Sequence, residues 1–120
     1  MNKVDFCLIE GAGGWRVPLN PRETMADLAR ALDIPVLLVV GIRLGCINHA
    51  LLTADSIVRD GLKLAGWVAN CVEPEQPARQ ENVDSLRALL PFPLLGVVPF
   101  LDSPSLQTVS SHLDISKLIG

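Results

Sequence analysis

The stretch Val36-Leu37-Leu38-Val39-Val40 decides the fold. It follows Pro35, and its apolar side chains are not interrupted by any polar one. A solid apolar block of this length is typical of a strand that helices cover on both faces, which is the usual situation in a parallel sheet. We therefore expect a buried parallel strand here.

Further helices and strands are predicted on both sides of this stretch. The residues from Thr24 to Asp27 have the spacing of a capping box, which predicts a helix from about Met25 to Leu32. Gly61 and Pro91 are expected to end two further helices. The other predicted strands are Val4–Ile9, Leu64–Ala69 and Pro93–Val98. The apolar faces predicted for the second and third helices are Ile47, Leu51, Ala54 and Val58, and then Val83, Leu86, Leu89 and Leu90.

Strands that alternate with helices at spacings of about 25 to 30 residues indicate stacked βαβ units. The predicted fold class is therefore α/β, a doubly wound and mostly parallel sheet, in a single domain over residues 1–120. We expect residues 99–111 to be polar and irregular, before a short apolar segment from Leu113 to Ile119. Ligands of such sheets bind at the carboxyl ends of the strands, so the loops after Ile9, Val40, Ala69 and Val98 are the candidate site.

Composition excludes several classes of function. The chain has 10 Lys and Arg against 13 Asp and Glu, a net charge of −3, so it has no basic stripe for a nucleic acid. The longest apolar run, Ile34 to Val40, is too short to span a membrane, and Asp5 interrupts the amino-terminal stretch before a secretory core forms. Three cysteines without CxxC spacing argue against a disulfide framework or a zinc site. We expect a cytoplasmic protein that binds no nucleic acid and no membrane.

The first candidate loop begins at Glu10 and continues as Gly11-Ala12-Gly13-Gly14. A carboxylate at the end of a strand can hold a hard cation such as Mg²⁺, while glycines let backbone N–H groups approach a phosphate closely. The alternative is an exposed strand end followed by a plain turn.

Two further loops carry residues suited to polar ligands. The stretch from Gly41 to His49 opens a helix whose first N–H groups can receive a carboxylate or phosphate; alternatively, Gly45 makes a turn and Cys46 or Asn48 a plain cap. Asn70 offers a donor and an acceptor to a base, or else caps its own turn. Cys46 has no base partner in the sequence, so we do not interpret it as a nucleophile.

Four stretches together resemble the dethiobiotin synthetase family, in its carboxyl-terminal half. They are IEGAGGW (9–15), VVGIRLGCINHA (39–50), LAGWVAN (64–70) and PLLGVVP (93–99). The resemblance implies an incomplete sheet of the phosphate-loop NTPase type. It also implies a homodimeric enzyme that closes the ureido ring of dethiobiotin, a step of biotin synthesis, from 7,8-diaminononanoate (diaminopelargonate), carbon dioxide and ATP with Mg²⁺.

The resemblance also implies roles for particular residues. Glu10 corresponds to a magnesium ligand, and Gly11, Ala12 and Gly13 lie beside the nucleotide phosphates. Asn70, with its neighbour Cys71, corresponds to the adenine contact. The family's nucleotide-binding loop falls on Pro99, Phe100 and Leu101, and its site for the substrate carboxylate at the dimer interface falls on Leu44, Gly45, Cys46 and Asn48.

The chain departs from the family pattern in one important respect. It contains no G-x-x-x-x-G-K-[ST] motif, so the phosphate-loop lysine is absent and no residue is assigned a catalytic role. The family's diamine-handling lysine and serine and its second magnesium carboxylate are also missing, and its nucleotide-contacting glutamate falls on Leu106. We expect the isolated chain to be inactive unless a separate chain carries the phosphate loop.

The resemblance has a structural implication as well. It places the family's first strand between the strand that ends at Glu10 and the strand Val36–Val40. Without that strand, the two must pair directly or leave backbone groups unpaired. A non-catalytic fragment that keeps part of a nucleotide pocket and a dimer surface is the alternative function. A related ATPase of the partitioning or cobyrinate amidation type fits the stretch LGCINHA less well.

Overall fold

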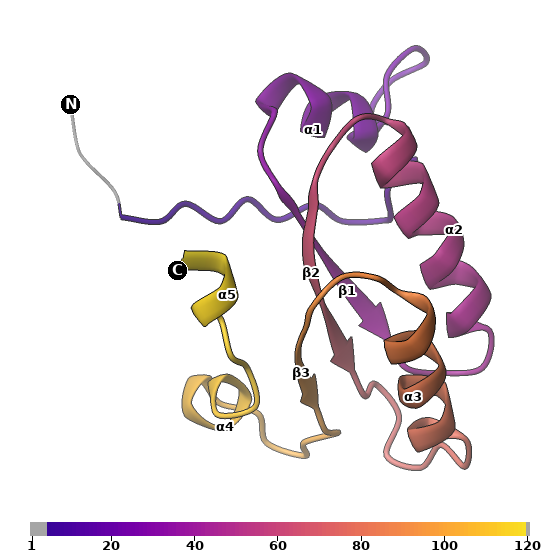
Figure 1. The fold of residues 1–120 in the computed structure, drawn as a ribbon, viewed down its shortest axis with the longest axis vertical. Helices are drawn as coiled ribbons and strands as arrows, with labels where there is room; N and C mark the ends of the chain where they lie inside the picture. The colour runs from indigo at the N-terminus through magenta and orange to yellow at the C-terminus, as the bar shows by residue number, and fades with distance from the viewer. Residues whose placement is uncertain (1–4, 120) are drawn as a thin grey trace.

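A computed structural model describes residues 5–119 of the chain (Figure 1). Its strands form one parallel sheet in the order β1-β2-β3. The elements are α1 (Met25–Leu32), β1 (Val36–Gly41), α2 (Cys46–Arg59), β2 (Leu64–Asn70), α3 (Arg79–Leu89), β3 (Leu94–Val98), α4 (Leu106–Ser110) and α5 (Ser116–Ile119). Among the described residues, no helix is long and apolar enough to cross a membrane.

Helices cover both faces of the sheet (Figure 1). The larger core packs α2 and α3 against one face, and its fully buried side chains are Ile42, Ile57, Trp67 and Leu86. The smaller core lies on the other face, where Val109, Leu113 and Leu118 pack against Val68, Leu95 and Val98. This arrangement confirms the predicted α/β class with helices on both sides of a parallel sheet.

The beginning of α1 forms as the capping-box spacing predicts. The N–H of Thr24 donates to the Asp27 carboxylate over 2.8 Å. This backbone hydrogen bond holds the pKa of Asp27 below its usual value, since it favours the charged carboxylate. Residue Asp33 caps the other end in the left-handed conformation, with φ at 51°.

The strand predicted over Val4–Ile9 is not formed. Val4 lies outside the described residues, and residues 5–10 pair with no strand. The side chains of Phe6, Leu8 and Ile9 are exposed, Leu8 by 74%. The sequence of this segment favours a strand, but a strand also needs a hydrogen-bonded neighbour, and the segment has none. The segment and β1 therefore do not pair, and no other part of residues 5–119 pairs with the outer edge of β1.

Three other predictions need correction. Val58 and Leu89 were expected in the core but are 51% and 53% exposed, because α2 buries Ile57 in place of Val58 and Leu89 lies on the outer side of α3. Residues 99–111 are not wholly irregular, since Ser105 and Thr108 cap the short helix α4 with reciprocal hydrogen bonds. A helix this short leaves no periodic pattern for a sequence to reveal.

The contrast between two leucines of α3 gives a test of this packing. Leu86→Ala removes a fully buried side chain and leaves a cavity, so we expect the free energy of unfolding to fall by about 2–5 kcal/mol. The matched control Leu89→Ala removes a half-exposed side chain and is expected to cost less than about 1 kcal/mol. Urea unfolding followed by tryptophan fluorescence measures both. Equal losses would contradict the assigned faces of α3.

Candidate functional site

The carboxyl ends of the three strands lie side by side. The N–H of Ile42 donates to the carbonyl of Asn70 over 2.8 Å, and the N–H of Cys71 donates to the carbonyl of Val98 over 2.9 Å. The loops that follow β1, β2 and β3 therefore start from one edge of the sheet, as the sequence predicts. These three loops form the candidate site.

The loop after β1 turns sharply into α2 at Gly45, whose φ of +89° is a conformation that favours glycine. The Cys46 side chain is buried in the core, and its N–H donates to the Arg43 carbonyl over 3.0 Å. In contrast, Asn48 is exposed and Leu44 is 93% exposed. Of the residues predicted to bind the substrate carboxylate, Leu44 and Asn48 are therefore the ones whose side chains are accessible.

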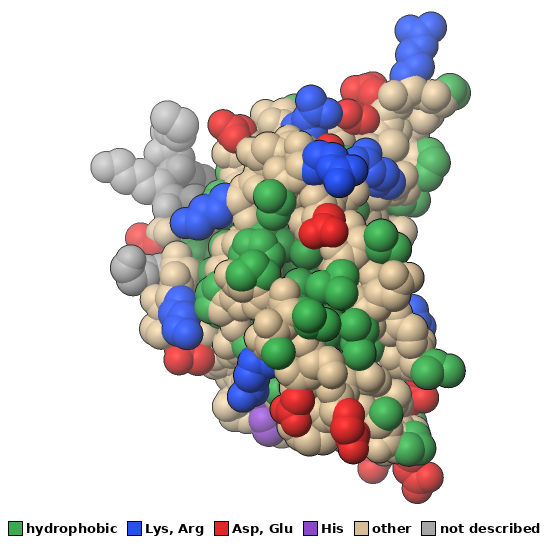
Figure 2. Space-filling view, turned by 45° about the vertical axis from the view of Figure 1, so that its right-hand side comes forward, with side chains coloured by type: hydrophobic (Ala, Val, Ile, Leu, Met, Phe, Trp, Pro, Cys, Tyr) green, Lys and Arg blue, Asp and Glu red, His purple; other side chains and the backbone are tan. Residues whose placement is uncertain are grey.

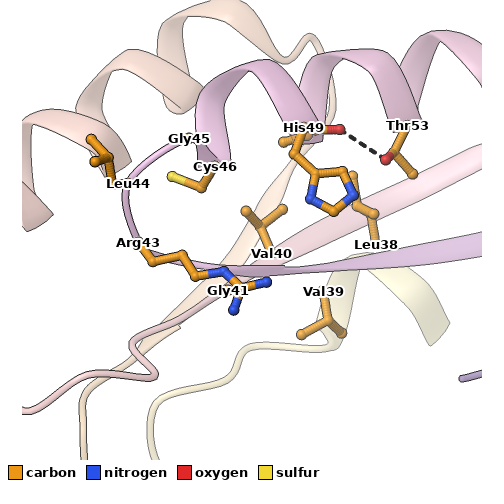
Figure 3. Close-up of a pocket in the computed structure, with 11 residues that line it drawn as sticks. Leu38, Val39, Val40, Gly41, Arg43, Leu44, Gly45, Cys46, His49 and Thr53 are labelled. Carbon is orange, nitrogen blue, oxygen red and sulfur yellow. Dashed lines mark hydrogen bonds between the residues drawn. The ribbon is translucent and has the colours of Figure 1, made fainter. Parts of the chain in front are cut away.

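A pocket of about 360 Å³ lies between this loop, β1 and α2 (Figure 3). Figure 3 shows the Arg43 side chain running back along β1 and the His49 ring pointing from α2 toward the strand. Thr53 donates its hydroxyl to the carbonyl of His49 over 2.8 Å. The pocket thus carries one fixed positive charge, the Arg43 guanidinium, beside the first turn of α2, which holds no acidic residue.

A side chain of α3 holds the loop after β2 in place. The Arg79 guanidinium donates to the backbone carbonyls of Glu73 and Pro74 over 2.6 and 3.2 Å. These bonds hold the chain just beyond Asn70, which is half-buried at the end of β2. Within residues 5–119, the buried Nε of Arg79 and Oε1 of Gln76 have no hydrogen-bond partner.

Cys71 is buried beneath this loop. Burial raises the pKa of its thiol, because the thiolate is poorly solvated there, and the nearby Arg79 guanidinium acts in the opposite direction. Its backbone N–H already donates to the carbonyl of Val98. Since the Cys71 thiol is buried and its N–H is bonded to Val98, Asn70 carries the accessible polar side chain of this pair, and the predicted role of Cys71 stays a prediction.

The loop after β3 carries Pro99 and Leu101, both half-buried, and Phe100, which is exposed. It leads to α4, where Leu106 is 85% exposed at the first helical position. The three predicted nucleotide-loop residues therefore lie at the same edge as Asn70.

The loop from Glu10 to Gly13 does not reach this edge. A side chain on Gly11 would touch Met25 at the start of α1. Just beyond the loop, the Trp15 indole donates to Asp60 over 2.7 Å, and Arg16 forms an ion pair with Asp60 at 3.3 Å. Asp60 ends α2 at the opposite side of the sheet, and Figure 1 shows the amino-terminal segment crossing above the strand arrowheads.

We expected all four loops to lie at the carboxyl edge of the sheet. This prediction is wrong for the first loop, because residues 5–9 form no strand that would lead it there. The roles of Glu10, Gly11, Ala12 and Gly13 stay predictions. Among the described residues, no group of three or more His, Cys, Asp or Glu side chains is placed to hold a metal ion.

Sequence reasoning missed several residues that shape the site. Arg43 and His49 line the pocket, and Arg79 fixes the loop after β2. No local pattern marks Arg79 because its partners are backbone carbonyls, and none sets Arg43 and His49 apart within the predicted stretch 41–49.

A parallel sheet flanked by helices, with polar loops gathered at its carboxyl edge, defines an α/β protein of the phosphate-loop NTPase type. The model of the AAA domain family matches residues 1–108. The chain belongs to the AAA domain family.

The chain is also similar to proteins named ATP-dependent dethiobiotin synthetase BioD. It is 56% identical to the one from Cellvibrio japonicus over 119 residues, which are 99% of this chain and 52% of the relative. For Pseudomonas paraeruginosa the identity is 57% over 116 residues, 97% of this chain and 51% of the relative. For Janthinobacterium sp. the identity is 54% over 115 residues, which are 96% of this chain and 49% of the relative. The chain spans about half the length of these relatives, and the resemblance read from the sequence is confirmed.

The three free cysteines give a test of the site's packing. Cys7 is exposed, whereas Cys46 and Cys71 are buried and the pKa of Cys71 is raised. We expect iodoacetamide at pH 7.5 to modify Cys7 at least about tenfold faster than Cys71, since the thiolate is the reacting form. Peptide mapping by mass spectrometry measures each rate. Rapid modification of Cys71 in the folded chain would contradict its placement beneath the loop.

Proposed function

We propose that this chain forms part of an ATP-dependent dethiobiotin synthetase. The proposed reaction closes the ureido ring of dethiobiotin from 7,8-diaminononanoate and carbon dioxide, with ATP and Mg²⁺. The observation that carries the proposal is the 56–57% identity to synthetases over nearly the whole chain. The three loops at one sheet edge support it, because that edge is where ligands bind in this fold class.

The residues of this chain have proposed roles in binding and orientation. The Asn70 amide pairs with the adenine base, and Pro99, Phe100 and Leu101 line the nucleotide beside it. The exposed Asn48 and the first turn of α2 receive the substrate carboxylate, and we add Arg43 because its charge lines the same pocket.

In the proposed reaction, one substrate amine adds to carbon dioxide and loses a proton to give a carbamate. The carbamate oxygen then takes the terminal phosphoryl group of ATP, and ADP leaves. The second amine attacks the carbamoyl carbon and loses a proton, phosphate leaves, and the ring closes. This chain offers no lysine-bearing phosphate loop for the phosphoryl transfer, so we place that group outside its sequence.

Mg²⁺ belongs to the proposal as the partner of the ATP phosphates. The described residues do not form a magnesium site by themselves, because Glu10 stands apart from the edge that carries Asn70. One carboxylate together with phosphates and waters suffices for this ion. The proposed ligand role of Glu10 requires that the segment carrying it lie at the edge that carries Asn70.

A homodimer and a cytoplasmic location complete the proposal. Figure 2 shows apolar side chains gathered over the face of α2 and α3, where the exposed Val58 and Leu89 line a pocket of about 570 Å³. An exposed apolar face of this kind suits a partner subunit. Free rather than paired cysteines suit a reducing compartment.

The direct test supplies the missing half. We expect the purified chain alone to hydrolyse no ATP, because it lacks the lysine that stabilises charge on the transferring phosphoryl group. Mixed or co-expressed with the uncovered half of the Cellvibrio japonicus synthetase, it should form dethiobiotin from diaminononanoate, bicarbonate, ATP and Mg²⁺, as measured by mass spectrometry. Turnover by the chain alone, or none by the assembled pair, would contradict the proposal.

A substitution tests the adenine contact in the assembled pair. Asn70→Ala is expected to raise the KM for ATP about three- to tenfold, which is the loss of one or two hydrogen bonds to the base. The control Asn82→Ala removes an amide of the same size from α3, where we propose no role, and should leave the KM unchanged. If both variants behave alike, Asn70 does not contact the nucleotide.

A further inference from the structure

The loop 99–111, which follows β3, is held at both of its ends. At its beginning, the carbonyl of Val98 accepts a hydrogen bond from the N–H of Cys71 over 2.9 Å. At its end, the chain comes back beside β3, and the N–H of Asp114 donates to the carbonyl of Leu95 over 2.7 Å. Figure 1 shows this course, out through α4 and back past β3. The two ends of the loop therefore lie close together, as in a compact surface loop.

Gly96 allows the returning chain to lie this close to β3. A Cβ atom at Gly96 would overlap the carbonyl oxygen of His112, and it would lie 2.9 Å from the carbonyl carbon of His112 and 3.1 Å from the Cα of Leu113. A side chain here would push the returning backbone away from the strand. Gly96 is not one of the glycines with a positive φ, so the requirement is for space and not for an unusual backbone conformation.

The residues that a side chain would displace are bonded to α4. The N–H of His112 donates to the carbonyl of Val109, and the N–H of Leu113 donates to the carbonyl of Ser110, both over 3.1 Å. The side chains of Val109 and Leu113 also pack in the smaller core. A displacement of His112 therefore carries over to α4 and to the rest of the loop.

The loop begins at the proposed nucleotide contacts. Val98, two residues after Gly96, is the partner of Asn70 in the sheet, and Pro99 to Leu101 follow it directly. These three loop residues line the nucleotide in the proposed function. A loop that is held at both ends is ordered before the nucleotide arrives, so binding does not have to supply the free energy of ordering it.

We propose that Gly96 is a positioning residue for nucleotide binding. It gives the backbone of His112 room against β3 and so keeps the loop 99–111 closed at its base. The closed loop holds Pro99 to Leu101 beside Asn70. This role rests on the proposed function, because the nucleotide belongs to that proposal.

Gly96→Ala tests the proposal in the assembled pair of this chain and the uncovered half of the relative. We expect the Kd for ATP with Mg²⁺, measured by calorimetry without diaminononanoate, to rise at least about fivefold, since binding must then order the loop. The matched control is Gly66→Ala, which brings a Cβ within 3.0 Å of the Pro93 carbonyl oxygen. It crowds β2 and β3 away from the loop, so the Kd should stay within about twofold.

Hydrogen exchange in this chain alone gives a readout that does not depend on the assembled pair. The N–H of Asp114 should be protected in the unsubstituted chain before any nucleotide is added. Gly96→Ala should speed exchange at Asp114 and Val109 at least about tenfold, whereas Gly66→Ala should leave both amides protected. Free exchange at Asp114 in the unsubstituted chain would overturn the proposal. Circular dichroism verifies that the variants fold.

A second variant covers the case in which Gly96→Ala does not fold. Asp114→Pro removes the hydrogen bond that closes the loop without crowding β3. We expect the same rise in the Kd for ATP, and an unchanged Kd would overturn the proposal.

The two glycine variants separate positioning from a loss of stability alone. An equal Kd for both, or faster exchange in Gly96→Ala with an unchanged Kd, would overturn the positioning role. An assembled pair that binds ATP with the expected difference but forms no dethiobiotin would refute the proposed function and leave the role of Gly96 standing. A pair that binds no ATP would refute both.

Discussion

Backbone hydrogen bonding across β2 is the constraint on which the rest of the structure depends. β2 pairs in parallel with both β1 and β3, and it carries Trp67, the largest fully buried side chain. A parallel sheet exists only if crossover helices return the chain each time, so this pairing also places α2 and α3 on one face. The cores on both faces of the sheet follow from that arrangement.

The pairing register of β1, β2 and β3 also positions the candidate site. Gly41, Asn70 and Val98 are neighbours across the sheet, so the loops that follow them share one edge although they are far apart in sequence. The sharp turn at Gly45 and the Arg79 bonds then fix two of these loops. Residues 5–14 pair with none of these strands, so the sheet does not position them for their predicted phosphate and magnesium roles.

Much of this fold can be predicted from the sequence, because several of its elements depend on short-range patterns. The apolar block Val36–Val40 and the capping box at Thr24 confirm their predictions because burial and capping leave short-range patterns. The sequence of residues 5–9 predicts a strand, and that prediction is wrong. A strand forms only beside a hydrogen-bonded neighbouring strand, which no local pattern reveals. Arg43 and His49 line the pocket and Arg79 bonds to backbone carbonyls, and neither feature leaves a pattern in the sequence, so their part in the site was missed. The resemblance to dethiobiotin synthetases identified candidate residues, but it did not place them.

Among residues 5–119, no segment pairs with the outer edge of β1, whereas the N–H of Asp114 donates to the Leu95 carbonyl on the outer side of β3. Amide exchange along β1 in the isolated chain, measured by NMR at low concentration, tests this difference most directly. We expect alternation, with slow exchange at Leu38, Val40 and Ile42, whose N–H groups face β2, and fast exchange at Leu37, Val39 and Gly41. Uniformly slow exchange along the strand would mean that both of its edges are paired, and it would contradict the account.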